Sequence, residues 1–387
     1  MRLLHVVPTY LPATRYGGPI YSVHGLCKAL ASQGHDVHVF TTNVDGPGDS
    51  DVPLAKPVDV DGVHVWYFPS RYLRRLYWSP PMARALRKAI STFDLLHLHS
   101  IYLWPTWIAA RMARRYKVPY ILAPRGMLVK DLINRKSRWL KTAWITLIER
   151  HNLEQAAVLH LTSEREAQDC RSFGFRLPPM FVVPNGVELV KEPDLLAEPN
   201  TVVREIIKHQ PLLLFLSRIN WKKGLDRLLE AMVYIPHGYL AIAGNDEENY
   251  TPTLRDLARE LGVMDRVSFI GPVQGVDKEY LFRNASLLVL PSYSENFGNV
   301  VLEAMARGCP AVVTPEVGVA DIVTLSGGGQ VVTGAPRHLG ESIATLLNEP
   351  AELLIKGEAG RKHVVENYSW DAIAQKMISV YQTRATC

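Results

Sequence analysis

The stretch that decides the fold reads Pro291-Ser-Tyr-Ser-Glu-Asn-Phe-Gly-Asn-Val-Val-Leu-Glu-Ala-Met-Ala-Arg-Gly-Cys-Pro310. Short apolar runs at 285–290 and 311–314 flank it, and their length and Val/Leu content are typical of buried strands. Between these runs, a polar loop is followed by a helical pattern that Gly308 and Pro310 close. The stretch therefore predicts a strand–loop–helix–strand unit of a parallel sheet.

The loop of this unit has the features of a phosphate-binding turn. It follows the C-terminal end of a strand, which is where open α/β sheets bind ligands. The helix that begins near Asn299 presents backbone N–H groups and a partial positive charge at its N-terminus. Two carboxylates flank that position, Glu295 in the loop and Glu303 on the helix. The stretch alone leaves open whether they form an acid–base pair or hold a ligand.

Length and composition favour a globular protein of two domains. The chain has 387 residues, too many for one ordinary core, with 47% apolar and 21% charged residues. Its four cysteines have no metal-ligand spacing, which indicates a reducing compartment, and we expect a cytoplasmic protein. The N-terminus reads as a strand rather than a signal peptide, and no apolar run approaches the ~18 residues of a membrane span.

Strand and helix patterns alternate along both halves of the chain. The expected strands are 3–7, 36–41, 63–67, 95–99, 120–123, 158–161, 181–184, 212–216, 238–243 and 267–270. The expected helices are 21–33, 105–116, 137–155, 163–173, 225–233, 253–261, 278–283, 351–368 and 371–384, and 71–90 is a basic helical region interrupted by Pro80-Pro81. An acidic linker with two prolines, 188–200, separates the halves. This α/β pattern predicts two doubly wound parallel sheets with a ligand cleft between the domains.

Basic residues in the second half complete a diphosphate site. Arg218 and Lys223 lie five apart in the loop after strand 212–216. Arginine can fork two phosphate oxygens, while lysine acts as a point charge. A carboxylate nearby can accept hydrogen bonds from ribose or sugar hydroxyls. A diphosphate clamp with hydroxyl acceptors is the chemistry of a sugar-nucleotide, although a basic loop of either residue alone is more often simply solvated.

Together these motifs resemble the family 4 retaining glycosyltransferases. Glu295 with Glu303 is similar to their Glu-x7-Glu motif, and Ser217-Arg-Ile-Asn-Trp-Lys-Lys-Gly224 to their phosphate loop. Gly17-Gly18 resembles their N-terminal glycine turn, 183–187 their interdomain strand end, and 243–246 a further strand end. The resemblance implies the GT-B fold, with an acceptor domain at 1–190, a nucleotide-sugar domain at 191–368, and a last helix at 369–387 that crosses back to the first domain.

The resemblance also implies a role for each matching residue. Glu295 would hold hydroxyls of the transferred sugar, Glu303 the ribose, and Arg218 with Lys223 the diphosphate. The whole donor-binding set is Gly17, Gly18, Arg218, Lys223, Asn245, Gly271, Val273, Glu295, Asn296, Phe297, Gly298, Asn299, Val300 and Glu303. The candidate catalytic residues are Glu295, Arg218, Lys223, Arg125 and His99.

Arg125 marks a departure from the family pattern. Many members have a histidine after the strand that here ends at Ala123, whereas this chain has Pro-Arg-Gly-Met at 124–127. Arginine stays protonated and cannot serve as a general base, so Arg125 would stabilise the leaving phosphate or orient the acceptor. A subset of polysaccharide-building members shares this stretch. His99, at the end of the neighbouring strand, either faces the same cleft or is a structural histidine, and His97 is interpreted as structural.

No carboxylate is an obvious nucleophile at the anomeric carbon, so we expect front-face displacement with retention. The diphosphate would leave stabilised by fixed cations, without a metal or other cofactor. Asp49-Ser-Asp51 has the form Asp-x-Asp but lies in a Gly/Pro-rich loop, so we interpret it as a solvated turn rather than a metal site.

Residues 66–150 are strongly basic and rich in tryptophan. They carry 17 Lys/Arg against three acids, and six of the eight tryptophans. Their basic and aromatic side chains suit an anionic membrane surface, and the alternative is an ordinary solvated basic face. We therefore expect a polyprenyl-linked saccharide acceptor, reached by peripheral docking on the membrane, in bacterial cell-surface polysaccharide synthesis.

Two other classes of function stay open at this point. A sugar-nucleotide epimerase of the same architecture would act on the donor without an acceptor. A nucleic-acid-binding protein would use the basic window, but the sequence has no helix-turn-helix, zinc or RNP-type signature. For the donor, UDP-glucose is favoured over GDP-mannose, because residues 245–247 show no clear guanine pocket.

Overall fold

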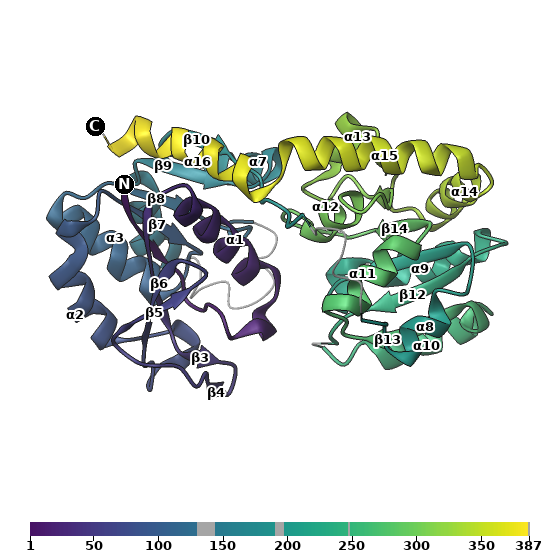
Figure 1. Cartoon of the computed structure of the whole chain (residues 1–387), viewed down its shortest axis with the longest axis horizontal. Helices are drawn as coiled ribbons and strands as arrows, with labels where there is room; N and C mark the ends of the chain where they lie inside the picture. The colour runs from purple at the N-terminus through teal and green to yellow at the C-terminus, as the bar shows by residue number, and fades with distance from the viewer. Residues whose placement is uncertain (130–143, 190–196, 247, 386–387) are drawn as a thin grey trace. The chain divides into compact units, whose positions relative to one another are not determined.

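The computed structural model describes residues 1–129, 144–189, 197–246 and 248–385. The chain divides into two compact units (Figure 1). The first unit comprises Met1–Gly186 and Trp370–Cys387, and the second comprises Val187–Ser369. The first unit is thus discontinuous in sequence, because the whole second unit is inserted into it.

The first unit is built on an eight-stranded sheet of order β10-β9-β8-β7-β1-β2-β6-β5. The strands are β1 Arg2–Val6, β2 Asp36–Thr42, β5 Pro57–Val60, β6 Val63–Phe68, β7 Leu95–His99, β8 Tyr120–Ala123, β9 Val158–Leu161 and β10 Met180–Val182. All pairs are parallel except β5 with β6. A two-stranded hairpin, β3 Val44–Asp45 and β4 Gly48–Asp49, stands apart from this sheet. Neither β5 nor the hairpin was expected from the sequence.

The helices of the first unit are α1 Gly18–Ser32, α2 Pro80–Ala89, α3 Trp104–Tyr116, α6 Arg150–Glu154, α7 Glu164–Arg171 and α16 Trp370–Ala385. Pro80-Pro81 begins α2 and does not interrupt a longer helix, because proline fits the first helical turn and the Ser79 hydroxyl caps it. Of the helix expected over 137–155, the described part consists of a π-helical turn, Ile145–Glu149, followed by α6.

The two faces of the first sheet differ in chemistry. Leucines such as Leu96 and Leu98 face α2 and α3 in an apolar core. The residues between them include His97, whose Nδ1 lies 2.8 Å from the hydroxyl of Tyr381 on α16. Because strand side chains alternate between faces, one face of this sheet is apolar and the other is lined by histidines.

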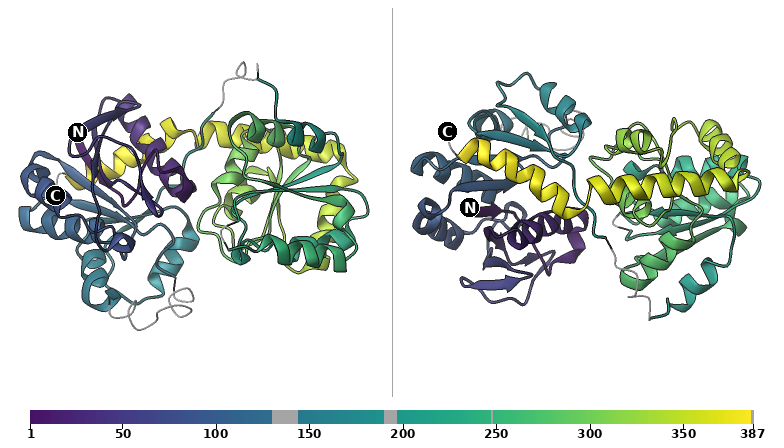
Figure 2. Two further views of the ribbon diagram at one scale, coloured as in Figure 1. Left: turned by 90° about the horizontal axis from the view of Figure 1, so that it is seen from below. Right: turned by 45° about the horizontal axis from the view of Figure 1, so that its top comes forward.

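Helix α16 packs beside α1 on the histidine-lined face (Figures 1 and 2). Its first residue, Trp370, occupies space that two glycines leave open. A Cβ built on Gly25 would lie 2.2 Å from the Trp370 ring, and one on Gly186 would lie 2.6 Å from it. A side chain at either position would therefore displace the indole.

The second unit holds a six-stranded, wholly parallel sheet of order β13-β12-β11-β14-β15-β16. The strands are β11 Leu212–Leu216, β12 Tyr239–Ala243, β13 Val267–Gly271, β14 Leu287–Leu290, β15 Ala311–Val313 and β16 Gly329–Val331. The helices are α8 Thr201–Ile206, α9 Leu225–Ala231, α10 Thr251–Glu260, α11 Gly275–Asn284, α12 Asn299–Met305, α13 Ala320–Ser326, α14 Pro336–Leu347 and α15 Pro350–Asn367. Helices cover both faces of this sheet (Figure 2), as its apolar strands require.

Both sheets reverse strand order at one point. The reversal lies between β1 and β7 in the first unit, and between β11 and β14 in the second. Ligands of open α/β sheets bind outside the carboxyl ends of the strands at such switch points. In the described part of the chain, no helix is both long and apolar enough to cross a bilayer.

Candidate active site

The loop after β11 brings two predicted cations to the switch point of the second unit. Its backbone is tied to the neighbouring strand end, because Ile219 N donates to Asn245 O at 2.8 Å. The Asn220 side chain then caps a 3-10 turn, Trp221–Lys223. The turn leaves Arg218 exposed and buries Lys223. The ammonium is therefore held in a buried position by the fold, while Arg218 lies at the surface of the same loop.

Gly224 lets this loop press against the end of β14. Its φ is +68°, and a Cβ there would lie 2.0 Å from the Pro291 carbonyl oxygen. Only glycine is compatible with this approach. The two loops at the switch point are thus in backbone contact.

The loop after β14 holds Glu295 in place by backbone pairing. Glu295 N donates to Glu316 O at 3.1 Å, and Gly318 N donates to Glu295 O at 3.0 Å. A Cβ on Gly318 would lie 2.0 Å from Asn296 O, so this pairing also depends on glycine. The backbone of Glu295 is therefore fixed on both sides.

Lys223 and Glu295 form an ion pair at the switch point. Their side chains are only 10% and 19% exposed, so the pair is largely withdrawn from water. An ammonium has three N–H donors, and one carboxylate oxygen occupies at most part of that capacity. The pair can hold an anion and hydroxyl groups side by side.

The remaining residues predicted around the phosphate lie at the start of α12. Gly298 adopts a left-handed conformation with φ +97° as the N-cap of the helix. Phe297 is buried in the core and contributes only backbone to the surface. Glu303 follows on α12, where Lys278 of α11 lies 2.7 Å away in an ion pair. A ligand hydroxyl at Glu303 would share that carboxylate with Lys278.

The predicted base position lies near the ends of β12 and β13. Gly244 N donates to Gly271 O at 2.9 Å, and Asn245 is exposed beside them. The Asp246 carboxylate accepts from the backbone of Tyr250 and Thr251 at 2.8 Å each, which fixes its orientation at this position.

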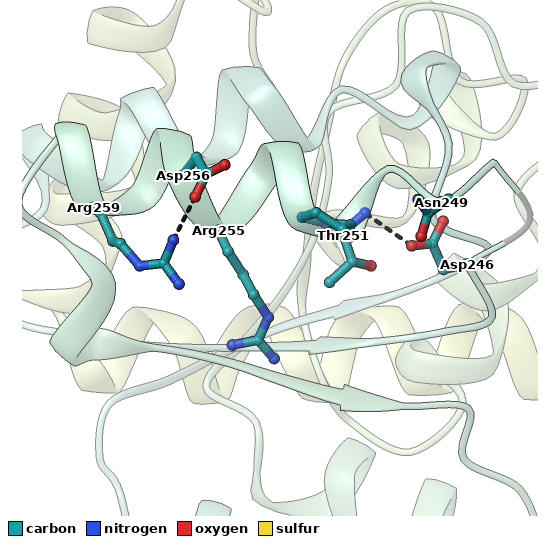
Figure 3. Close-up of a pocket in the computed structure, with 7 residues that line it drawn as sticks. Asp246, Asn249, Thr251, Arg255, Asp256 and Arg259 are labelled. Atoms are coloured by element: carbon teal, nitrogen blue, oxygen red, sulfur yellow. Dashed lines mark hydrogen bonds and ion pairs between the residues drawn. The ribbon is translucent and has the colours of Figure 1, made fainter.

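A pocket of about 360 Å³ opens beside this position, between the β12 loop and α10 (Figure 3). Arg255 and Arg259 extend into it from one face of α10, with Asp246 and Thr251 at its far end. Arg259 pairs with Asp256, whereas the Arg255 guanidinium lies 4.7 Å from the centroid of the Phe269 ring.

The glycine turn of the first unit lies at the other switch point. Gly17 has φ +69°, and Gly18 is the first residue of α1. The loop before it is anchored through Tyr10, whose hydroxyl lies 2.8 Å from His24 Nδ1. His24 Nε2 in turn lies 2.9 Å from Asp61 Oδ2. Because the carboxylate only accepts, Nε2 carries a proton, and a neutral His24 accepts from Tyr10.

Arg125 is held inside the first unit by its own backbone and by its neighbours. Its φ is +55° and that of Gly126 is +71°, two successive left-handed residues. Glu166 fixes this turn by accepting from Gly126 N at 2.6 Å. The guanidinium donates to Asn185 Oδ1 at 2.9 Å and to His99 Nδ1 at 3.2 Å.

His99 lies buried beside Arg125. It is 1% exposed, and both ring nitrogens contact protein groups, Arg125 on one side and His5 Nδ1 at 3.0 Å on the other. Arg125 can only donate, so His99 Nδ1 accepts and its Nε2–H donates to His5. These contacts make His99 a support for the Arg125 guanidinium, and a catalytic role for it stays a prediction.

A second chain of hydrogen bonds runs through His97, which is structural as expected. His160 Nε2 must donate to Val183 O at 2.9 Å, so its Nδ1 accepts from His97 Nε2 at 3.1 Å. Tyr381 then donates to His97 Nδ1. Every ring of both chains is neutral in this scheme.

Burial keeps these rings neutral. Desolvation and then the nearby Arg125 charge lower the pKa of His5 and of His160 to about 3. Desolvation also holds the pKa of His97 and of His99 well below the ordinary value.

Two groups of described residues bring metal-ligating atoms within 4.8 Å of one another: His5 with His97 and His99, and Asp36 with His38 and His64. In the first group, the lone pairs of His97 and His99 accept hydrogen bonds from Tyr381 and Arg125. In the second, Trp66 donates to His38 Nδ1 at 3.3 Å, which leaves the His38 proton on Nε2, facing Asp36 at 2.9 Å. Both groups are better described as hydrogen-bonded protein contacts than as metal centres.

Asp49 of the Asp-x-Asp sequence has a structural partner. Arg74 donates to its Oδ1 at 2.6 Å, which ties the loop after β6 to the β3–β4 hairpin. The same loop exposes Tyr72 and Leu73, at 71% and 64%, between Arg71 and Arg75. Of the basic, tryptophan-rich window 66–150, the part that holds Arg135, Lys136, Arg138, Trp139 and Lys141 lies outside the described residues, whereas Trp144 lies within them.

Sequence reasoning missed the residues that support Arg125. Asn185 and Glu166 contact the Pro124–Met127 turn from distant parts of the chain. Glu166 also lies on the first turn of α7, where the Ser163 hydroxyl accepts from its backbone N–H at 3.2 Å. Gly126 after Arg125 was the one local indication, because a glycine at this position is typical of a tight turn with left-handed backbone.

Comparison with known proteins covers both units. Residues 17–186 match the family described as Glycosyl transferase 4-like domain, and residues 199–363 match Glycosyl transferases group 1. An uncharacterized glycosyltransferase of Methanocaldococcus jannaschii is 28% identical over 400 residues, covering 99% of this chain and 98% of that protein.

Two solved structures have a similar fold. The sucrose-phosphate synthase of Thermosynechococcus elongatus superposes with a TM-score of 0.75 at 23% identity, covering 99% of this chain and 98% of that one. Anabaena HepE in complex with UDP and glucose gives a TM-score of 0.75 at 18% identity, covering 99% and 100%.

Proposed function

The chain belongs to the family 4 type of GT-B glycosyltransferases, and on that premise we propose that it moves a hexose from a UDP-sugar to a saccharide acceptor with retention of configuration. The observation that carries this proposal is the Lys223–Glu295 pair at the switch point of the second unit. It joins a phosphate-binding cation to a hydroxyl-binding carboxylate in a largely dry position. UDP-glucose is the favoured donor, in keeping with the UDP and glucose bound to Anabaena HepE.

In the proposed reaction, the bond between the anomeric carbon and the β-phosphate oxygen breaks, and a bond to the acceptor oxygen forms on the same face. The acceptor proton passes to the departing phosphate oxygen. Lys223 donates to the phosphate while keeping its contact with Glu295, and Arg218 adds a bidentate contact. Fixed cations thereby take the part that a metal ion plays in other transferases.

Glu295 and Glu303 have separate roles in this proposal. Glu295 accepts from hydroxyls of the transferred sugar, and Glu303 accepts from the ribose beside Lys278. Arg125 orients the acceptor or stabilises charge on the phosphate. We do not assign either glutamate as a nucleophile.

The proposed acceptor is a lipid-linked saccharide, reached by docking of the first unit on an anionic membrane from the cytoplasmic side. The loop that exposes Tyr72 and Leu73 between two arginines supports this part of the proposal. Flotation with liposomes tests it: wild type should rise with anionic vesicles at low salt, and Tyr72→Ser/Leu73→Ser should rise less. Equal behaviour of both proteins, or no binding at low salt, would remove this part of the proposal.

A thermal-shift screen with UDP-glucose, UDP-galactose and GDP-mannose tests the donor. We expect the largest stabilisation from UDP-glucose, since a ligand that binds only the folded state raises its stability. Glu295→Ala should then abolish sugar transfer, and the assay is run well below the Tm of the variant because Lys223 loses its buried partner. The matched control is Glu341→Ala, which removes an exposed carboxylate paired with Arg337. Retained transfer by Glu295→Ala would overturn the proposed function.

A further inference from the structure

Tyr293 joins the two loops that carry Lys223 and Glu295. It lies two residues before Glu295, and its backbone N–H donates to Lys222 O at 2.7 Å. Its hydroxyl donates to Asp226 Oδ2, on the first turn of α9, at 2.8 Å. The same side chain is thus fixed at its backbone by one loop and at its tip by the helix that follows that loop.

Arg227 packs on the ring of Tyr293. The guanidinium carbon lies 3.5 Å from the ring centroid, a close cation–π contact. On its other side, a Cβ built on Gly334 would lie 2.3 Å from Arg227 Nη1, so the Gly334 backbone lies directly against the guanidinium. The ring of Tyr293 therefore cannot swing toward Arg227, and its hydroxyl is aimed at Asp226.

This arrangement is costly as a way of packing two loops. Asp226 Oδ1 and Arg227 Nη1 are buried without a hydrogen-bond partner among the described residues. Each buried, unsatisfied polar group costs roughly 1–3 kcal/mol. Apolar side chains of similar size would pack the same space without that cost. We therefore explain Tyr293, Asp226 and Arg227 by the positions in which they hold the two loops rather than by a gain in stability.

We propose that Tyr293, Asp226 and Arg227 are positioning residues that fix Glu295 relative to Lys223 in the geometry needed for transfer. The inference rests on the proposed function, in which these two side chains hold the sugar and the diphosphate. None of the three positioning residues is assigned a contact with the donor. Their removal should therefore slow the reaction more than it weakens donor binding.

The test uses Tyr293→Phe, which keeps the ring and its contact with Arg227 and removes only the hydroxyl. We expect kcat to fall about 10-fold, the factor that corresponds to the loss of one hydrogen bond to a charged group. The donor KM should change less than about twofold and the Tm by no more than a few degrees. The assay follows UDP release from UDP-glucose in the full-length chain with water as acceptor, or the equivalent release from the donor that the thermal-shift screen selects.

Two further variants separate positioning from general stability. Asp226→Asn keeps an acceptor for the Tyr293 hydroxyl and should stay within about threefold of wild type, whereas Asp226→Ala should match Tyr293→Phe. Tyr239→Phe is the matched control, because it also removes a tyrosine hydroxyl bond, to Ser268 at 2.6 Å, on β12 of the same unit. It should leave kcat unchanged.

The outcomes distinguish this inference from the proposed function. If Glu295→Ala is inactive and Tyr293→Phe keeps the wild-type kcat, the positioning role is wrong while the proposed function stands. The same holds if Tyr293→Phe and Tyr239→Phe lose activity equally, or if activity falls only as the Tm falls. If Glu295→Ala is active, both fail together.

Discussion

The two units share a topology but fill their switch points with different chemistry. In the second unit, β11 reads Leu-Leu-Leu-Phe-Leu and β14 reads Leu-Leu-Val-Leu, apolar on both faces, and charge is confined to the loops beyond the strands. In the first unit, β1, β7 and β9 each carry histidines between leucines or valines. One sheet keeps its polar groups outside the core as Lys223 and Glu295, and the other buries them as neutral imidazoles.

This difference teaches that one fold can serve two purposes at the same position. The charged pair of the second unit can change partners when a ligand arrives, because an ammonium and a carboxylate both have spare capacity. The imidazoles of the first unit have their protons assigned by fixed partners, Arg125 at one end and Val183 O at the other. We therefore expect changes in the charged pair of the second unit to act mainly on transfer, and changes among the buried histidines of the first unit to act mainly on stability.

The largest expected effect is acid instability of the first unit. The unfolded chain takes up protons on histidine below about pH 6.5. In the folded unit the pKa of His5 and His160 is about 3, and the pKa of His97 and His99 is held well below the ordinary value, so these rings stay neutral and stability falls as the pH is lowered from about 6.5. Each imidazole that stays neutral in the folded state lowers the stability by roughly 1 kcal/mol per pH unit below that point.

Urea unfolding at pH 7.0 and 5.5 checks this, with peptide-resolved hydrogen exchange to assign each transition to a unit. The charged and titratable groups around the cluster are Arg125, Glu166, Tyr381 and Cys27. The Glu166 carboxylate accepts from Gly126 N and Thr162 N rather than from an imidazole. The four histidines of the second unit, His209, His237, His338 and His363, are not buried, so strands β11–β14 should keep their protection at pH 5.5. Equal acid sensitivity of both units would break the comparison.

The next largest effect is expected for Lys223→Met, which should lower the rate of sugar transfer. Removing one preorganised donor to a developing oxyanion costs about 100- to 1000-fold in kcat. Steady-state kinetics measure it, with Lys208→Met, which removes an exposed lysine paired with Glu205, as the control. A variant that transfers at the wild-type rate would show that the charged pair is structural, like the histidines.

Tyr381→Phe should destabilise the first unit by about 1–3 kcal/mol, because His97 Nδ1 would lose its donor in a buried position. Thermal unfolding and hydrogen exchange of α16 measure the change. Thr383→Ala, on an exposed face of the same helix, should stay within about 0.5 kcal/mol of wild type. If the Tyr381 variant were as stable as the Thr383 control, the hydrogen bond from α16 to His97 would contribute nothing to the stability of the first unit.

The smallest effect belongs to the Asp-x-Asp sequence. Asp49→Ala removes an exposed ion pair with Arg74 and should cost no more than about 1 kcal/mol, without loss of transfer. The measurement is transfer rate and Tm in the presence of EDTA or added Mg²⁺. If this variant lost a metal-dependent activity, Asp49 would be part of a metal site, and its pairing with Arg74 would not be its main role.

Much of the fold follows from short-range patterns in the sequence. The runs around residues 285–290 and 311–314 were long and apolar enough to predict β14 and β15. The elements that were missed have weak local signals: β5 is only partly buried on an edge, and α8 is six residues long after a proline-containing acidic stretch. Length and burial, rather than propensity alone, decide which elements can be predicted.

The site was predictable where a motif spans one loop and less so where distant strands meet. Glu295 and Lys223 lie on the loops after the neighbouring strands β14 and β11 and form an ion pair there. The contacts of the buried His99 could not be predicted, because they come from His5 on β1 and from Arg125 after β8, which are distant in sequence. The alternation of leucine and histidine at 95–99 indicated only the burial, because it places His97 and His99 on the same face of a buried strand.

The insertion of the second unit into the first has a consequence for synthesis on the ribosome. Trp370 and Tyr381 cannot reach Gly25 and His97 until the 183 residues of Val187–Ser369 have been translated. At about 5–20 residues per second, this delay lasts roughly 10 to 40 seconds. The nascent first unit waits during that time with its histidine-lined face uncovered. A chain that stops before Trp370 would leave incomplete the unit that was made first, while the unit made last would have its whole sequence.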